Sequence, residues 1–367
     1  MVNSIGNLAI RRADNFRIIR LVAASAVIFS HAYALNMGLT FATLLKEPLF
    51  AWTGVTFGDL AVNVFFVTSG FLVSRSLMDG GRARDFVMAR VLRIYPGLIV
   101  AVLACALVLG PLVSNLGLAQ YLAKKATWAF VLYDSAAIAP LNMRFELPGV
   151  FVHNPYADVV NASLWTLPWE IWMYISLLVL SSLRLTGRAF PALLAVVLTG
   201  YGLSQFGVWK PFDSFPILTR FLAFFYVGVA LCRYRKIVPI SGKVALGLTG
   251  LFVLGSVLAQ NTFFEPFYVG YMTLFVAYWP PGVIRRWSEG ADISYGVYIY
   301  AYPVQQTWVW LLGPHNVLLN CALTFPIAAA LGFASWVLIE KPALNLKARL
   351  RARPAKLAEA IQNAAGT

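Results

Sequence analysis

The segment RIIRLVAASAVIFSHAY, residues 17–33, decides how the rest of the chain is interpreted. It is apolar apart from an arginine near its start, Arg20, and a histidine near its end, His31. On a helix these two positions are about three turns apart, so both side chains lie on one face, about 16 Å from each other along the axis. If the helix crosses a membrane, the imidazole lies deep inside it. An ionisable group at that depth indicates a functional site.

The composition indicates that a membrane is the surrounding solvent. Of the 367 residues, 60% are hydrophobic and 12% are charged, whereas soluble domains contain about 25% charged residues. The chain is therefore expected to be an integral membrane protein. Its three cysteines lie far apart in apolar segments, without CxxC spacing, which disfavours disulfides and zinc, and we expect no metal. They are Cys105, Cys232 and Cys321.

Ten apolar segments approach the length of about 20 residues that a bilayer-spanning helix needs. They follow one another without a long polar interval, so the sequence predicts an all-α membrane protein, a single bundle of about ten transmembrane helices. A shorter apolar run at 121–133 is expected to be an interfacial or re-entrant element within the long loop 114–162. The ten segments are residues 17–37, 57–78, 92–113, 163–183, 190–208, 216–233, 243–260, 263–281, 292–312 and 316–339.

The positive charges predict the orientation of the bundle. Most of the 29 Lys and Arg residues fall in the alternate connections that face the cytoplasm if the N-terminus is inside, as the positive-inside rule requires. Both termini are therefore expected to be cytoplasmic. The same rule accounts for the net charge of +14 without nucleic acid as a partner. We expect residues 1–342 to form the transmembrane domain and residues 343–367 a short basic cytoplasmic tail along the inner membrane surface.

The N-terminal stretch has a second interpretation, as a signal peptide. It has a charged start, a short apolar run and small residues at Ala32 and Ala34, which is typical of a cleavage site. Cleavage there would remove both Arg20 and His31. It would also leave nine spans and disrupt the alternation of charge, so we expect the first helix to be retained.

Three ionisable residues are predicted in the outer half of the bundle, each in a different span. They are His31, Asp59 and Glu170. Their convergence would supply a base and an acid to orient it. Each also has a structural interpretation: His31 as a hydrogen-bonded structural histidine, Asp59 as a solvated residue at a helix end, and Glu170 as the partner of an arginine.

A pair of arginines lies at the start of the third span, on the opposite, inner side. Arg90 and Arg93 are three residues apart, so on a helix they point the same way. Two guanidinium groups on one face form a suitable site for phosphate. The positive-inside rule also places such pairs at inner surfaces without any ligand, so both interpretations stay open.

Six short motifs occur in order along the chain at compatible spacing. They are Arg20 and His31 with ten residues between them, GDLAVNVFFVTSGFL at 58–72, RxxR at Arg90 and Arg93 followed by Tyr95 and Pro96, SLWTLPWEIWMY at 163–174, ISYGVYIYAYP at 293–303, and EKP at 340–342. Together they resemble the signatures of the membrane acyltransferase 3 family. This family comprises bacterial O-acyltransferases that modify lipopolysaccharide, peptidoglycan, exopolysaccharide and Nod-factor sugars. The resemblance covers about residues 15–342.

The resemblance implies a function and its location. The protein would lie in the bacterial cytoplasmic (inner) membrane as a multi-pass protein. It would move an acyl group, by default acetyl, from cytoplasmic acyl-CoA to a hydroxyl of a cell-surface or lipid-linked glycan. The partners implied are therefore acyl-CoA, or acetyl-CoA as the default, a glycan acceptor and membrane lipids.

The resemblance also implies roles for particular residues. His31 would be the catalytic base or the residue that transiently carries the acyl group. Glu170 or Asp59 would hold its tautomer or support its cationic form. The acyl-CoA would be bound by residues of the first three motifs, namely Arg20, Ser69, Arg90 and Arg93.

Two positions depart from the family pattern. Many members have a histidine where this chain has Ala301, and often an acid where it has Asn63. Neither change affects Arg20 or His31, so we interpret them as marks of a subfamily, although they weaken the assignment of accessory acids.

Recognition of the acceptor is expected from the bundle and its outer loops, above all from residues 114–162. This loop carries side chains suited to stacking on a sugar or, alternatively, to an aromatic belt at the membrane interface. They are Trp128, Tyr133, His153 and Tyr156.

Two other functions are considered. In a proton-coupled transporter or flippase, the three outer ionisable residues would form a proton relay. Transporters often contain internal repeats, and none is evident in this sequence. The second alternative is a membrane sensor that binds acyl-CoA without catalysis.

Overall fold

The computed structural model describes residues 4–10, 14–209, 211–259, 263–279 and 290–346. Over these residues the chain forms helices joined by loops, and its β-structure is limited to two isolated bridges, Ser4 with Pro239 and Glu146 with Val159. Most of the predicted tail, from residue 347 onward, lies outside the described residues.

Ten long helices form the body of the described part of the chain. In chain order they are α2 (Phe16–Met37), α5 (Phe57–Met78), α6 (Ala83–Ala104), α10 (Leu167–Ser182), α11 (Phe190–Gln205), α12 (Phe215–Arg233), α13 (Gly242–Ala259), α14 (Glu265–Tyr278), α16 (Ser294–Leu312) and α17 (Val317–Ser335). The shorter elements are α1 (Ile5–Ile10), α3 (Phe41–Leu44), α4 (Pro48–Thr53), α7 (Gly110–Val113), α8 (Leu118–Ala123), α9 (Lys125–Ala136), the 3₁₀ turn η2 (Ala162–Thr166) and two π-helical turns, η1 (Cys105–Leu109) and η3 (Trp336–Glu340).

Every predicted apolar segment overlaps one of these long helices, so the all-α prediction is confirmed. Among the described residues six helices are long and apolar enough to cross a membrane, which agrees with a multi-pass membrane protein. The count of about ten spans and the cytoplasmic location of the termini stay predictions. The six are Phe16–Met37, Phe57–Met78, Ala83–Val113, Ala162–Ser182, Phe215–Arg233 and Val317–Leu346.

Two helices extend further than the apolar segments predict. The third predicted span, 92–113, belongs to a continuous helical stretch that begins at residue 83, and the last one continues to residue 346. Arginine can keep its charged end in water while its methylene stem packs on apolar surface, so a helix continues past the edge of its apolar run. As a result Arg90 and Glu340, which lie outside the predicted segments, belong to helical structure rather than lying beside it. The run at 121–133 is divided between α8 and α9.

Glycines set the closest contact in the bundle, between α5 and α12. A Cβ atom on Gly70 would overlap the carbonyl oxygen of Phe225, and one on Gly228 would overlap that of Val67. Small residues at a helix crossing let the two backbones approach closely, which compensates for the weak hydrophobic driving force between helices in lipid. Most of the buried apolar residues form one large core cluster around this crossing.

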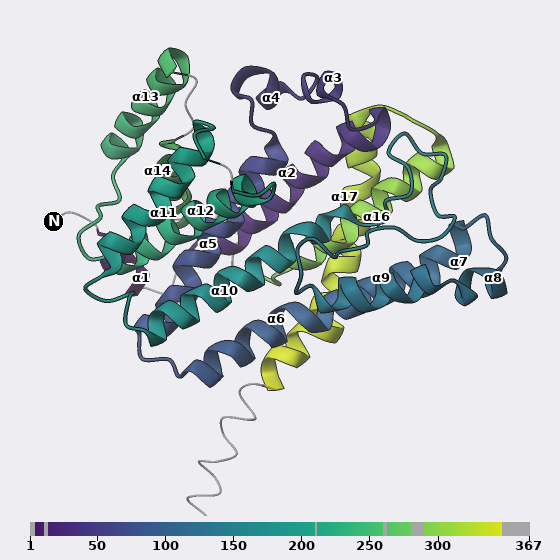
Figure 1. Ribbon diagram of the computed structural model, residues 1–367, viewed down its shortest axis with the longest axis horizontal. Coiled ribbons are helices and arrows are strands. Elements are labelled where there is room, and N and C mark those ends of the chain that lie inside the picture. Colours follow the sequence, from purple (N-terminus) through teal and green to yellow (C-terminus); the bar gives the residue numbers. More distant parts are fainter. Residues whose placement is uncertain (1–3, 11–13, 210, 260–262, 280–289, 347–367) are drawn as a thin grey trace, which may run out of the picture.

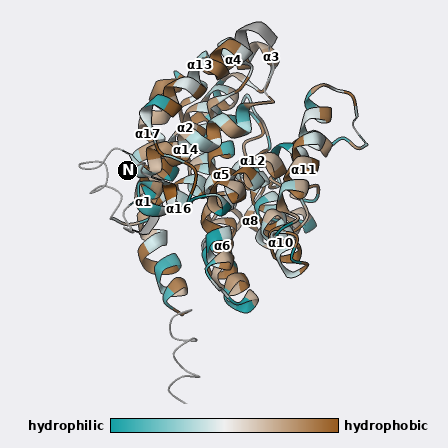
Figure 2. Cartoon of the chain, turned by 90° about the vertical axis from the view of Figure 1, so that its left-hand side faces the viewer, coloured by the Kyte–Doolittle hydropathy of each residue, from teal (hydrophilic) through white to brown (hydrophobic). Residues whose placement is uncertain are grey.

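The relative directions of the helices follow from a few contacts at their ends. On α2, Arg20 contacts Asp292 just before α16, and His31 contacts Tyr302 further along α16, so α2 and α16 run parallel. The α5 helix runs the opposite way, because its start approaches Ser30. These directions agree with the predicted alternation of the first, second and ninth spans. Figure 1 shows α6 with α9 along one side of the bundle and α13 at the opposite periphery. Hydrophobic residues cover much of the visible helix surface, and hydrophilic residues gather toward the lower end of α6 (Figure 2).

Candidate active site

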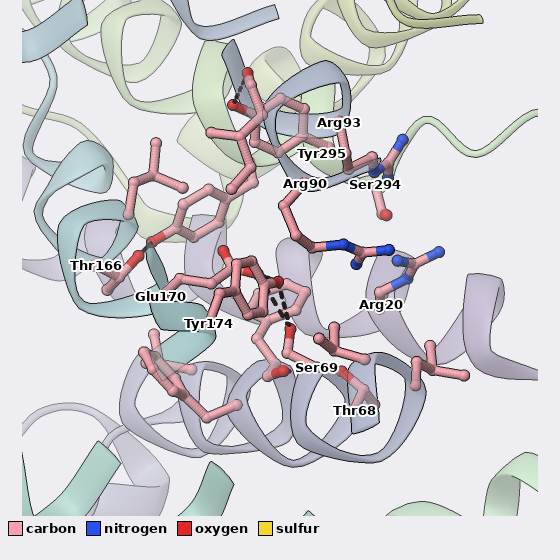
Figure 3. Close-up of a pocket in the computed structure, with 18 of the residues that line it drawn as sticks. Arg20, Thr68, Ser69, Arg90, Arg93, Thr166, Glu170, Tyr174, Ser294 and Tyr295 are labelled. Carbon is pink, nitrogen blue, oxygen red and sulfur yellow. Dashed lines mark hydrogen bonds between the residues drawn. The ribbon is translucent and has the colours of Figure 1, made fainter. Parts of the chain in front are cut away.

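A cavity of about 360 Å³ lies where α2, α5, α6, α10 and α16 meet. Five of the seven predicted site residues line it, namely Arg20, Ser69, Arg90, Arg93 and Glu170. The three arginines gather on one side of the cavity, and Ser69, Glu170 and Tyr174 lie together on the other (Figure 3). The structure therefore brings together residues that the sequence separates by as many as 150 positions.

Hydroxyl groups surround the carboxylate on the second side. The side chains of Ser69 and Tyr174 both donate to Oε1 of Glu170, Ser69 at 3.1 Å. Their two hydroxyl oxygens are 3.3 Å apart. Glu170 and Tyr174 are one turn apart on α10, so local helix geometry sets this contact. Glu170 makes no ion pair with any described residue, so no arginine in this part of the chain is the structural partner that we considered.

Two of the three arginines are held by buried acids. Arg93 donates to Oε2 of Glu340 at 3.0 Å and to Oδ2 of Asp292 at 2.9 Å. Arg20 donates to the same Oδ2 of Asp292 at 2.6 Å. The side chains of Glu340 and Asp292 are 0% and 8% exposed. Glu340 closes the π-helical turn η3, a type of irregularity that is frequent at functional sites.

Arg90 differs from both of its neighbours in the cavity. Its guanidinium group lies 5.7 Å from the centre of the Tyr174 ring, and its Nε, like that of Arg20, is buried without a hydrogen-bond partner among the described residues. Within the described ranges it makes no ion pair. A cation that faces a cavity without a protein anion is suited to an anionic ligand.

His31 lies outside this cavity. Its ring packs edge-on against Tyr302 at a centroid distance of 5.1 Å, and no described group is hydrogen-bonded to the imidazole. The hydroxyl of Tyr302 is itself buried without a partner. One turn earlier on α16, Tyr298 does line the cavity, and its hydroxyl is 2.7 Å from that of Thr166. One helical turn, about 5.4 Å, therefore separates the cavity wall from the neighbour of His31.

Asp59 belongs to a different group of charges, at the start of α5. Its Oδ1 accepts a hydrogen bond from Arg220 at 2.8 Å, and its Oδ2 accepts one from the Thr56 hydroxyl at 2.7 Å. Asp59 and Thr56 also form a capping box through their backbone N–H groups. Arg220 also donates to Asn63 at 2.9 Å, and Asn63 donates to Glu265 at 3.0 Å. Asp59 is thus paired rather than merely solvated.

The predicted convergence of three ionisable residues is therefore divided between two places. Neither Asp59 nor Glu170 is hydrogen-bonded to His31 in the described part of the chain. Asp59 is near enough for its charge to act on His31, whereas Glu170 is held in the cavity.

Four charged residues that the site prediction omitted contribute to these groups. Each is a charged residue in or beside an apolar segment. Placing charge near lipid is costly, and this cost is the signal by which the sequence could have identified these residues. They are Arg220, Glu265, Asp292 and Glu340, the last of which was noticed only as part of a motif.

Comparison with known proteins identifies the family of the chain. The family described as "Acyltransferase domain", acyltransferase 3, matches residues 14–341. The chain is 28% identical to "Nodulation protein 10" of Rhizobium leguminosarum bv. viciae, over 93% of this chain and 95% of that protein. It is 29% identical to an "O-acetyl transferase" of Shigella phage Sf6, over 90% of this chain and 96% of that protein. No solved structure matches significantly. The chain therefore belongs to the acyltransferase 3 family and is a membrane O-acyltransferase.

Proposed function

We propose that this enzyme transfers an acetyl group from cytoplasmic acetyl-CoA to a hydroxyl of a surface or lipid-linked glycan, in the bacterial inner membrane. One observation carries the proposal. A single helix, α2, contributes Arg20 to an arginine-lined cavity and His31 to a second polar position about three turns further along the same face. The name of the phage relative supports acetyl as the group transferred.

The cavity is suited to the donor. Its volume of about 360 Å³ lies in the range of about 300–1,000 Å³ that is typical of ligand sites. Arg90, which makes no ion pair with a described residue, offers its guanidinium to the phosphates of CoA. Arg20 and Arg93 lie beside it, and their charges are balanced by Asp292 and Glu340. Phe65 and Phe66 supply an apolar wall for the pantetheine arm. That arm would carry the thioester along the face of α2 toward His31.

The reaction follows from the chemistry of a neutral imidazole. His31 takes the proton from the acceptor hydroxyl, and the oxygen attacks the thioester carbonyl. The carbon–sulfur bond then breaks, and the CoA thiolate leaves with the proton that His31 had taken, which returns the imidazole to its neutral form. Asp59 supports the charge that His31 acquires, through space rather than by a hydrogen bond. Glu170 acts on the donor side, where it positions the hydroxyls of Ser69 and Tyr174.

A transfer assay tests the role of His31. Membranes that contain the wild type or His31→Ala are incubated with radiolabelled acetyl-CoA, and label in the glycan fraction is measured. Loss of a general base lowers the rate by about 10²–10⁴-fold, so we expect transfer to fall at least a hundredfold while acetyl-CoA still binds. His315→Gln is the control, because His315 bonds Asn320 and Gly313 away from the cavity. Normal transfer by His31→Ala would refute the proposal.

Mass spectrometry of surface glycans tests the acceptor. Cells with the gene are expected to carry O-acetyl groups that cells without it lack. Transport of an unmodified glycan without any acetyl transfer would instead support the flippase alternative.

A further inference from the structure

A second cavity, of about 650 Å³, lies at the ends of α5, α10 and α12. Four cationic side chains line it, namely Arg184, Arg233, Arg235 and Lys236. No carboxylate is among its lining residues, and the nearest acid in contact with them is Asp79, which pairs with Arg235 at 2.7 Å. The described walls of this cavity therefore carry an excess of positive charge.

Two of the four cations have structural roles. Arg233 donates to the Thr186 carbonyl at 2.7 Å and lies over the ring of Phe190 at 5.7 Å, so it joins the α10–α11 turn to α12. Arg235 is held by Asp79. The other two, Arg184 and Lys236, are exposed and have no bonded partner in the described ranges. These two side chains are available to bind an anion.

The second cavity lies along the same faces of α5 and α10 as the first. On α5, Val73 lines the first cavity and Leu77, one turn later, lines the second. On α10, Tyr174 lines the first and Ser181, about two turns later, lines the second. Residues at these spacings lie on one face of a helix. The two cavities are therefore neighbours along one stripe, about 10 Å apart on α10.

We propose that the second cavity binds a phosphate monoester, the 3′-phosphate of the donor CoA, while the diphosphate lies at Arg90 in the first cavity. The choice of ligand rests on the proposed function. A terminal phosphate carries up to two negative charges and accepts hydrogen bonds from Arg and Lys. A phospholipid headgroup presents similar chemistry, so the experiment must separate the two sources.

Dephospho-CoA, which lacks only the 3′-phosphate, provides the first test. Binding of CoA and dephospho-CoA is measured on the full chain in nanodiscs. We expect the wild type to bind CoA about tenfold or more tightly than dephospho-CoA, because charge-assisted hydrogen bonds to the phosphate are lost. In the double variant Arg184→Gln with Lys236→Gln, CoA should bind no more tightly than dephospho-CoA. Dephospho-CoA itself should bind the variant and the wild type equally.

The matched control is Arg188→Gln with Lys243→Gln. Both residues are exposed and do not line the cavity. Arg188 lies in the same connection as Arg184, and Lys243 lies at the start of α13, just after the connection that carries Lys236. This variant loses the same net charge and should keep the preference for CoA. A wild type without that preference, or equal weakening of both ligands by the double variant, would overturn the proposal. If the wild type binds neither ligand, the proposed donor is wrong as well.

Anionic lipid provides the second test. Thermal stability is compared in nanodiscs with and without phosphatidylglycerol. If the double variant removes stabilisation by this lipid and leaves the preference for CoA unchanged, the phosphate belongs to a lipid and the assignment to the donor is wrong. If the double variant keeps the stabilisation by phosphatidylglycerol and loses the preference for CoA, the assignment of the phosphate to the donor is supported.

Discussion

Arg90 and Arg220 are two partly buried arginines in opposite states. All three nitrogens of Arg220 donate hydrogen bonds, to Asp59, to its carbonyl and to Asn63. Arg90 lines a cavity, its Nε has no partner, and its guanidinium makes no ion pair with a described residue. A guanidinium whose three nitrogens all donate to protein groups holds helices together, whereas one with an unbonded buried nitrogen requires a ligand or water. The contrast separates a structural arginine from a candidate binding residue.

Arg93 shows that the RxxR motif contains one arginine of each kind, a structural arginine and a candidate binding residue. It is one turn from Arg90 on α6, yet it pairs with Asp292 and Glu340 from distant parts of the chain. The RxxR pattern predicts equal roles for the two arginines, and the packing makes them different.

The largest expected effect comes from breaking the pairing of Arg93. Arg93→Met leaves the buried carboxylate of Glu340 without its cation, and breaking a buried ion pair in this way typically costs about 3–5 kcal/mol. Arg20 still contacts Asp292, but Glu340 keeps only a hydrogen bond from Ser335. Thermal unfolding in detergent should therefore show a large loss of stability for Arg93→Met and a small one for Arg90→Met. Equal losses in the two variants would contradict the contrast.

Asp134 extends the comparison to a buried acid held by backbone N–H groups instead of an arginine. It lies on α9, outside the candidate spans, and accepts hydrogen bonds from the amides of Arg144 and Phe145. Burial raises its pKa to about 6, from 3.8. Between about pH 4 and 6 the folded state therefore binds more protons than the unfolded state, and stability falls as pH rises through this window.

Asp134→Asn should remove that dependence, because the amide has the same shape and does not titrate. A shift of one pKa unit corresponds to about 1.4 kcal/mol, so the slope is measurable by thermal unfolding at a series of pH values. An identical slope in the variant would show that another group is responsible.

The smallest expected effect in free energy concerns ligand affinity. Arg90→Met should weaken acyl-CoA binding by about tenfold, which is about 1.4 kcal/mol, and leave the folded protein stable. Arg84→Met is a matched control, since Arg84 is exposed on the same helix and does not line the cavity. Binding by isothermal titration in nanodiscs distinguishes the two. Unchanged affinity in Arg90→Met would remove the proposed phosphate contact.

The packing explains why Asn63 departs from the family pattern. Asn63 stands where the family often has an acid, and its amide connects Arg220 to Glu265. A carboxylate from α14 is therefore present close to the position where the pattern expects one. Sequence comparison with the motif alone shows only the loss, because Glu265 is 202 residues away.

The sequence by itself determined the helical membrane fold, the family and the common face of Arg20 and His31. These depend on composition and on the helical period, which act over a few turns of chain. Only the tertiary structure decided which charges are paired. Arg93 meets acids 199 and 247 residues away, and His31 lies beside Tyr302 rather than beside Glu170. Helix periodicity is local, whereas ion pairing in a low-dielectric interior depends on which helices pack together.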